Sequence, residues 1–249
     1  MTRIALQLYT VRRECATDFL GALATTASLG FDGVELHDLH GHSAKAVRSA
    51  LDGHGLVACG RHALLDAIEG DIDGLADELD TLGTDRLVLA WIEPPRTAAD
   101  ADAAVERILA ASERATQAGL RLGFHNHDGE LAVLEDGRTL LDRLIAEGPP
   151  PFLELDLGWA WYAGTDPVAL VVRTQGRAPL LHVKDLRRNG GPVHVPLGDG
   201  EVAYTGLRAA AEAAGVDWLI VEQDETEGPA FAAVERSLAR LRVLLEEQA

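Results

Sequence analysis

Short apolar runs alternate with longer amphipathic segments from one end of the chain to the other. The runs are rich in Leu, Val and Ile, which is typical of strands in a parallel sheet covered by helices. They predict strands at residues 3–8, 32–36, 56–60, 86–91, 120–125, 152–156, 180–183 and 218–222. N-cap residues, glycines and prolines bound the segments between them. These predict helices at residues 18–29, 43–54, 71–82, 97–117, 138–146, 167–174, 204–214 and 230–247.

This alternation gives eight strand–helix pairs with no segment left over, which is what a (β/α)8 barrel needs. Residues 187–200 form a polar loop, the one substantial insertion, and Gly-Pro-Pro-Pro at residues 148–151 breaks the chain before the sixth strand. A doubly wound sheet is the competing fold, but no GxGxxG motif follows the first strand. No linker divides the chain. We therefore predict a single α/β TIM-barrel domain over residues 1–249.

Composition narrows the range of partners and compartments. The net charge of −18 argues against a nucleic-acid partner, because binding phosphates requires a basic surface. No apolar run approaches the roughly 18 residues of a membrane span, and the first strand begins too early for a secretory signal. The two cysteines, Cys15 and Cys59, form no CxxC motif. We expect a cytoplasmic protein with both thiols reduced in the core.

Four consecutive strands end in a residue that can bind a metal. These residues are His125, Asp156, His182 and Glu222. In a TIM barrel the carboxyl ends of the strands meet on one face, where the chemistry takes place. Two imidazoles and two carboxylates can hold a divalent first-row metal and leave positions open for substrate. The pattern therefore predicts a metal site, in which His127 or Glu130 could replace His125 as the fifth-strand ligand.

Two further charged residues lie close to these strand ends. Glu154 shares a face with Asp156, because residues two apart on a strand point the same way. It lies one layer deeper, so we expect it to pair with a neighbour rather than bind the ion. Lys184 has two interpretations that the sequence leaves open: a cation for an anionic oxygen of the substrate, or a structural partner for Glu154.

Several other residues fall at the mouth of the predicted barrel. Aromatic side chains there commonly stack on sugars or exclude water, and we expect Trp159 to do so and Trp161 to pack against the next helix. Glu35 lies at the end of the second strand, and His62 follows the third. We expect Glu35, His62, Trp159 and Lys184 to contact substrate.

Six motifs resemble the sugar phosphate isomerase/epimerase family, in the xylose isomerase-like TIM-barrel superfamily. They are Leu6-Gln-Leu-Tyr-Thr-Val-Arg12, Gly30-Phe-Asp-Gly-Val-Glu35, His125-Asn-His-Asp128, Leu155-Asp156-Leu-Gly-Trp159, His182-Val-Lys-Asp185 and Val221-Glu-Gln-Asp224. The resemblance implies a divalent metal (Mn²⁺, Mg²⁺, Co²⁺ or Zn²⁺) held by His125, Asp156, His182 and Glu222. Two departures are clear: the epimerases usually have Glu in place of His125, and a histidine in place of Trp159.

The resemblance implies a metal-dependent sugar isomerase or epimerase that removes a proton next to a carbonyl and forms an enediolate. Glu222 is the expected base, and His127, Glu130 or Lys184 would be the second. A lyase or dehydratase acting on a keto-sugar or inosose is the alternative, because such enzymes share the histidine-rich fifth strand.

Two more distant alternatives stay open. An abasic-site endonuclease would need a basic surface and more histidine ligands, which the net charge opposes. A non-catalytic sugar-binding barrel would keep the pocket without needing the metal. In each enzymatic case the expected partner is a small carbohydrate, and residues 187–200 could cap the mouth or a neighbouring copy in a homo-oligomer.

Overall fold

Eight parallel strands close into a barrel in this computed structural model, which describes residues 2–146 and 152–247. The predicted break at residues 148–151 lies outside the described residues. The barrel strands are β1 (Arg3–Gln7), β2 (Gly33–Leu36), β3 (Val57–Ala63), β4 (Arg86–Leu89), β5 (Arg121–His125), β6 (Phe152–Asp156), β7 (Leu180–Val183) and β10 (Trp218–Val221). The (β/α)8 prediction is confirmed.

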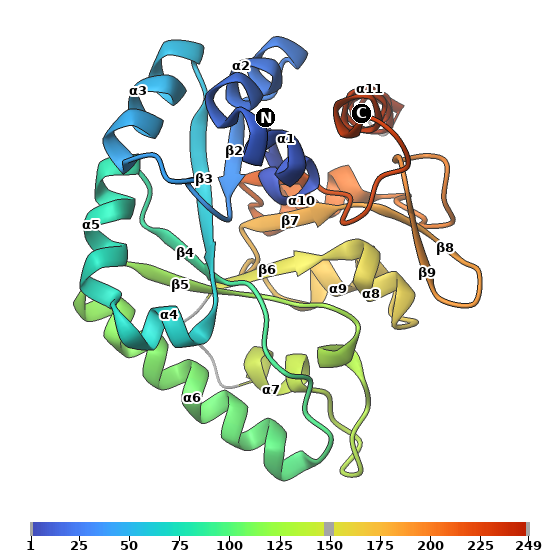
Figure 1. Ribbon diagram of the computed structural model, residues 1–249. Coiled ribbons are helices and arrows are strands. Elements are labelled where there is room, and N and C mark those ends of the chain that lie inside the picture. Colours follow the sequence, from blue (N-terminus) through green and yellow to red (C-terminus); the bar gives the residue numbers. More distant parts are fainter. Residues whose placement is uncertain (1, 147–151, 248–249) are drawn as a thin grey trace.

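Helices surround the barrel, and one follows most strands (Figure 1). The longer ones are α2 (Phe19–Leu29), α3 (Ala44–His54), α5 (Ile72–Leu82), α6 (Ala98–Gln117), α7 (Leu140–Ala146), α9 (Pro167–Arg173), α10 (Leu207–Ala214) and α11 (Ala230–Glu247). Polar N-caps start several of them as the sequence predicts; Ser43 accepts a hydrogen bond from the third residue of α3. A large apolar layer lies between these helices and the strands.

The prediction that no segment is left over is wrong. Three short helices, α1 (Arg12–Thr17), α4 (Leu65–Gly70) and α8 (Leu157–Tyr162), and two 3₁₀ turns, η1 (Leu8–Val11) and η2 (Gly129–Leu131), lie between the predicted elements. The predicted polar loop at 187–200 is instead largely an antiparallel hairpin, formed by β8 (Asp185–Arg188) and β9 (Pro192–Val195). It projects beside α8 in Figure 1. Each of these elements is too short to show a clear hydrophobic period.

The third strand also differs from its predicted bounds. It runs to Ala63, three residues beyond the predicted end, so His62 lies on the strand rather than after it. The register against β2 shifts between Val34 and Glu35, where β3 contains one extra residue. Such a bulge redirects the side chains that follow it, and it leaves His62 in the barrel.

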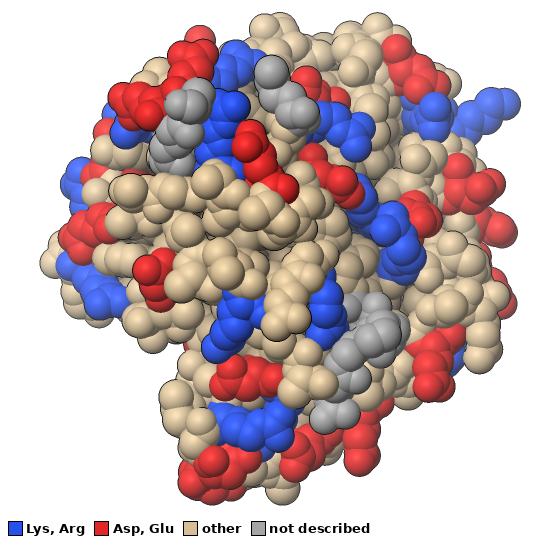
Figure 2. Space-filling model, turned by 180° about the vertical axis from the view of Figure 1, so that it is seen from behind, with Lys and Arg blue, Asp and Glu red and all other residues tan. Residues whose placement is uncertain are grey.

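Acidic and basic side chains are mixed on the surface of the protein. Figure 2 shows acidic and basic side chains interspersed over the face opposite to the view of Figure 1. Many basic groups are paired; Arg107, for example, lies 2.6 Å from Glu69 and 3.0 Å from Asp66. Among the described residues, no helix is both long and apolar enough to cross a membrane.

Candidate active site

The inner face of the barrel changes from apolar to polar along the strands. A small cluster of buried residues, which includes Cys59 and Trp218, fills its floor. In three strands the inward residue two positions after a member of this cluster is polar. Gln7 lies two residues after Ala5, His182 two after Leu180, and Glu222 two after Ile220. Alternation in a strand keeps residues two apart on one face, so this polar layer lies directly above the apolar floor, at the carboxyl ends of the strands.

The four predicted metal-binding residues come together in this polar layer. One ligand atom from each of His125, Asp156, His182 and Glu222 lies within 4.8 Å of the others. His182 Nδ1 is 2.8 Å from Glu222 Oε2, and His125 Nε2 is 3.8 Å from Asp156 Oδ2. Asp156 and His182 are direct neighbours across the β6–β7 pair. The buried Asp156 Oδ2 accepts no hydrogen bond of good geometry from a described residue, although the ammonium of Lys184 lies 2.8 Å away.

The other nitrogen of each histidine faces a different carboxylate. His125 Nδ1 lies 2.9 Å from Glu154 Oε2, and His182 Nε2 lies 2.7 Å from Glu35 Oε2. Gln7 Nε2 donates to the same Glu35 oxygen at 2.8 Å. Metal-binding histidines almost always donate their second ring N–H to such an acceptor, which fixes the tautomer and the ring orientation. This arrangement fits a metal held by the nitrogens that face Asp156 and Glu222.

A second set of four residues also lies within metal-binding distance. It consists of His62, His125, Glu154 and His182. All three imidazoles point at one oxygen, Glu154 Oε2, which is 2.7 Å from His62 Nε2 and 3.3 Å from His182 Nε2. His62 and His125 form hydrogen bonds with that oxygen, whereas Asp156 Oδ2 of the first set accepts none, so we favour the first set. Glu154 thus pairs with neighbouring histidines, and its not binding the ion stays a prediction.

The buried charges of this layer do not balance. Four carboxylates, those of Glu35, Glu154, Asp156 and Glu222, face one ammonium, Lys184, and all five residues are at most 7% exposed. An excess of carboxylates is costly to bury uncompensated. Burial lowers the pKa of His62 and of His182, but the neighbouring carboxylates outweigh it, raising the pKa of His62 to about 10 and that of His182 well above its usual value, so protons on these imidazoles offset part of the excess. A divalent cation would take the place of such protons, so the residues fit such an ion.

Lys184 lies among the predicted ligands rather than beside Glu154. Its ammonium is 2.8 Å from Asp156, 2.7 Å from Glu222 and 2.6 Å from Asp224. Of the two interpretations that the sequence left open for Lys184, pairing with Glu154 is not what the structure shows, because the side chain reaches Asp156, Glu222 and Asp224 instead. Burial would lower the pKa of Lys184, but these three carboxylates raise it well above its usual value. The group is a fixed cation.

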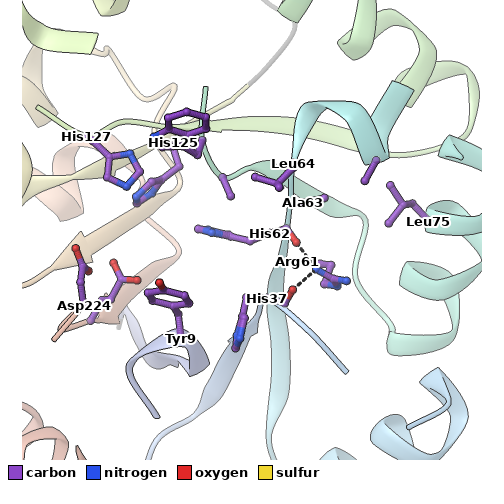
Figure 3. Close-up of a pocket in the computed structure, with 14 residues that line it drawn as sticks. Tyr9, His37, Arg61, His62, Ala63, Leu64, Leu75, His125, His127 and Asp224 are labelled. Atoms are coloured by element: carbon purple, nitrogen blue, oxygen red, sulfur yellow. Dashed lines mark hydrogen bonds between the residues drawn. The ribbon is translucent and has the colours of Figure 1, made fainter. Parts of the chain in front are cut away.

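His127 and Glu130 have different positions despite lying in one loop. His127 lines the cavity above His125 (Figure 3). Burial and the nearby Lys184 lower its pKa to about 4, so the ring is neutral at pH 7. Glu130 is 1% exposed and accepts a hydrogen bond from the backbone N–H of His127 at 2.8 Å. Its carboxylate closes its own loop and does not line the cavity.

The tryptophans of α8 also separate. Trp159 lies beside His127, with ring centroids 5.8 Å apart, and beside His194 of the hairpin at 5.5 Å. Its backbone N–H donates to Asp156 Oδ1 at 2.8 Å, so Asp156 caps α8 with one oxygen and faces the site with the other. Trp161 lies further out, with the guanidinium of Arg188 4.5 Å from its ring centroid.

A cavity of about 640 Å³ opens above the polar layer. Figure 3 shows His62 pointing into it, between His125 and His127 on one side and Tyr9 below. Glu222 and Asp224 also line it, whereas Glu35, expected to contact substrate, is fully buried beneath His62 and His182. Sequence reasoning assigned no role to Tyr9, Asp224 or His194. The position of Asp224 could have been predicted, because it lies two residues after Glu222 and so faces the same side of the strand.

The sequence matches a known family over most of its length. A model of the family described as xylose isomerase-like TIM barrel matches residues 23–244. The chain belongs to this family.

Three relatives of this xylose isomerase-like barrel illustrate its range. The rhizopine catabolism protein MocC of Rhizobium meliloti is 32% identical over 133 residues, a match that covers 46% of this chain and only 40% of MocC. A sugar phosphate isomerase/epimerase from Parabacteroides distasonis has a TM-score of 0.83 at 21% identity, over 97% of this chain and 94% of that one. An L-ribulose 3-epimerase has a TM-score of 0.78 at 17% identity, over 100% and 96%.

A Bacillus anthracis protein assigned as a 3-DHS dehydratase has the same barrel. Its TM-score is 0.78 at 16% identity, and the match covers 97% of this chain and 99% of that one. At such identities the likeness shows a shared fold.

Proposed function

We propose that this protein is a divalent-metal-dependent enzyme that removes a proton next to a carbonyl group in a sugar or a related polyol. The observation that carries the proposal is the paired environment of the two histidines. One nitrogen of each faces the Asp156–Glu222 side, and the other is bonded to Glu154 or Glu35. This is how metal-binding histidines are held in proteins.

In this proposal His125, Asp156, His182 and Glu222 hold the ion, and their mixed nitrogen and oxygen donors suit Mn²⁺, Mg²⁺, Co²⁺ and Zn²⁺. When bound, such an ion acts as a Lewis acid toward a carbonyl oxygen and as a template for the substrate. Burial raises the pKa of Glu222, but Lys184 and His182 outweigh it and hold that pKa well below its usual value. The carboxylate is thus ionised and able to accept a proton.

His127 supplies the second proton-transfer group. It enters the cavity from the loop after β5, whereas Glu222 follows β10, and its neutral ring can accept or donate a proton. Return of the proton to the neighbouring carbon or to the other face gives an isomerase or an epimerase. Lys184 fixes Glu222 and Asp224, His62 lines the space available to substrate, and Trp159 packs behind His127 without lining that space.

A dehydratase or lyase is the second candidate. It is favoured by the residues lining the cavity, which include the carboxylates of Glu222 and Asp224 and the imidazoles of His62, His125 and His127. A fifth-strand carboxylate, the partner base of an epimerase, is replaced by His125. One base, Glu222, can remove the proton, and one protonated imidazole can donate a proton so that the hydroxyl group of the next carbon leaves as water. His62 lines the cavity and has a pKa raised to about 10, so it can supply that proton.

Deuterium exchange tests both candidates. The protein with Mn²⁺ is incubated in D₂O with a panel of ketopentoses, ketohexoses and inososes, and the products are followed by NMR and mass spectrometry. An isomerase or epimerase yields deuterated sugars, and a dehydratase yields a product lighter by one water. We expect Glu222→Gln to reduce the rate at least ~100-fold, the scale of a lost general base. Absence of exchange and of water loss across the panel would overturn the proposal.

A further inference from the structure

The cavity has two chemically different ends. Figure 3 places His125, His127 and Asp224 on one side of it, and Ala63, Leu64 and Leu75 on the other. Ala67, Ala90 and Trp91 also line the cavity. Arg61 lies beside Ala63, and its guanidinium donates to the backbone carbonyl oxygens of His37 and His62. The Ala and Leu side chains offer no hydrogen bond, so hydroxyl groups of a sugar ring placed against them would be left without partners.

The apolar wall is unusually open to solvent. Leu64 is 57% exposed and Trp91 is 47% exposed. Among the described residues, the only exposed aromatic side chains are Tyr9 and Trp91, and both line this cavity. Single exposed apolar residues are ordinary, but a group of them around one concave surface marks a binding site.

Leu64 is also an unfavourable choice for its local structure. It occupies the N-cap of α4 and offers that helix no side-chain hydrogen bond. Ser, Thr, Asp and Asn stabilise this position, as Ser43 and Asp71 do for α3 and α5. A residue that breaks a local rule without a structural gain indicates a functional role. Its side chain faces the cavity, not the core.

We propose that the substrate carries an apolar substituent, alkyl or aryl, attached to its polyol ring, and that Leu64, Leu75 and Trp91 bind this substituent. The inference rests on the proposed function for the other end, where the reacting carbons lie. The cavity volume of about 640 Å³ suits such a composite molecule, since pockets of roughly 300–1000 Å³ enclose ligands of drug size.

Calorimetric titration of the Mn²⁺-loaded protein with matched glycosides tests the proposal. The probes are methyl and phenyl β-D-glucosides, galactosides and mannosides, which differ only in the apolar group. For at least one sugar we expect the phenyl compound to bind about 10- to 100-fold more tightly, from apolar area buried on the wall. Leu64→Ser should reduce that ratio to below about threefold and leave the methyl compound within about twofold, because the substitution also supplies an N-cap.

Val172→Ser is the matched control, an exposed apolar residue on α9, 61% exposed and outside the cavity lining. It should leave both affinities unchanged. A phenyl-to-methyl ratio near one on all three sugars would overturn the inference, and so would a ratio that Leu64→Ser leaves intact. Repeating the titrations with EDTA separates the apolar site from the metal-dependent function. If removal of the metal changes neither affinity, that result counts against the proposed function, whereas the phenyl-to-methyl ratio still tests the apolar site.

Discussion

The buried carboxylates Glu154 and Glu35 orient the two histidines of the proposed metal site. Each accepts from a histidine nitrogen whose ring also faces the predicted metal position. We predict that Glu154→Gln weakens Mn²⁺ binding about 10- to 100-fold, the usual effect of losing such an outer carboxylate. The amide can still fill the space, but its uncharged oxygen is a weaker acceptor than the carboxylate for the hydrogen bonds from His125 and His62. Metal affinity is measured by competition with a chelator of known affinity.

Glu130→Gln is the control for that measurement, because it makes the same substitution at another buried glutamate of the same face. It should leave the affinity for Mn²⁺ within about twofold, well inside the effect of an outer carboxylate. Equal weakening by both substitutions would show that general destabilisation, not the loss of the Glu154 contacts, lowers the affinity.

Glu130 gives a second prediction, about pH. Burial raises the pKa of Glu130 above its usual value, so the folded protein holds this proton more tightly than the unfolded chain does. Its contribution to stability is therefore present below the unfolded pKa and is lost as the pH rises through the folded pKa. Glu130→Gln keeps an acceptor for the His127 N–H and removes the titration. The variant should gain stability relative to wild type as the pH rises from about 4 to about 7.

Thermal unfolding across this pH range, with activity measured in parallel, checks the prediction. We expect kcat/KM to stay within about threefold of wild type, because the Glu130 carboxylate faces its own loop. A loss of about 100-fold, typical of a missing general base, would restore Glu130 to the catalytic role that the sequence suggested.

Residue spacing predicted part of this site and not the rest. The ends of four consecutive strands identified His125, Asp156, His182 and Glu222, and the structure brings them together. The layer that each side chain occupies depends on the stagger of the strands, which spacing along one strand does not contain. Glu35 was therefore expected to contact substrate, but it is fully buried. For Lys184 the sequence left open a pairing with Glu154, but its ammonium contacts Glu222 instead.

At the scale of elements, the hairpin β8–β9 depends on one buried carboxylate. Asp185, 3% exposed, accepts backbone N–H groups from Gly198, Gly200 and Val202, at 2.8, 2.9 and 3.1 Å. The hairpin thus returns to the barrel and places His194 beside Asp224 and Trp159. The last residue of the His-Val-Lys-Asp motif holds this segment in place.

We predict that Asp185→Ala destabilises the protein by about 2–4 kcal/mol, since it removes the buried, charged acceptor that several partly buried N–H groups share. Urea denaturation measures the loss. Asp199→Ala, at an exposed ion pair of the same segment, is the matched control and should cost less than ~1 kcal/mol. Similar losses for the two substitutions would contradict the role given to Asp185.

The pattern of apolar runs was sufficient for the barrel itself but not for its short elements. Strands such as β6 and β10 show as apolar runs with clear ends, so all eight were predicted with small errors at their boundaries. Helices α1, α4 and α8 have six residues each, under two turns, and show no complete amphipathic period. The hairpin is half-exposed and polar, so its strands lack the apolar signal.

On the scale of the whole molecule, the excess of acidic groups has two components that act differently. The surface part is interspersed with basic groups (Figure 2) and is screened by salt. The buried part, the carboxylates of Glu35, Glu154, Asp156 and Glu222 at the centre of the barrel, is not screened by salt and needs compensating cations: Lys184, protonated imidazoles or a metal ion. Stability of the whole protein should therefore depend on divalent metal.

We predict that Mn²⁺ at about 100 times its Kd stabilises the fold by about 2.7 kcal/mol, because the unfolded chain lacks the converged ligands. For a chain of this length that corresponds to a rise in Tm of roughly 5–10 °C. Differential scanning calorimetry with Mn²⁺ and with EDTA measures it. Asp156→Asn is the control: asparagine still caps α8 but loses the ligand charge, so the shift should shrink to within about 2 °C. An unchanged Tm in the wild type, or an equal shift in the variant, would mean that the ion does not bind at this centre.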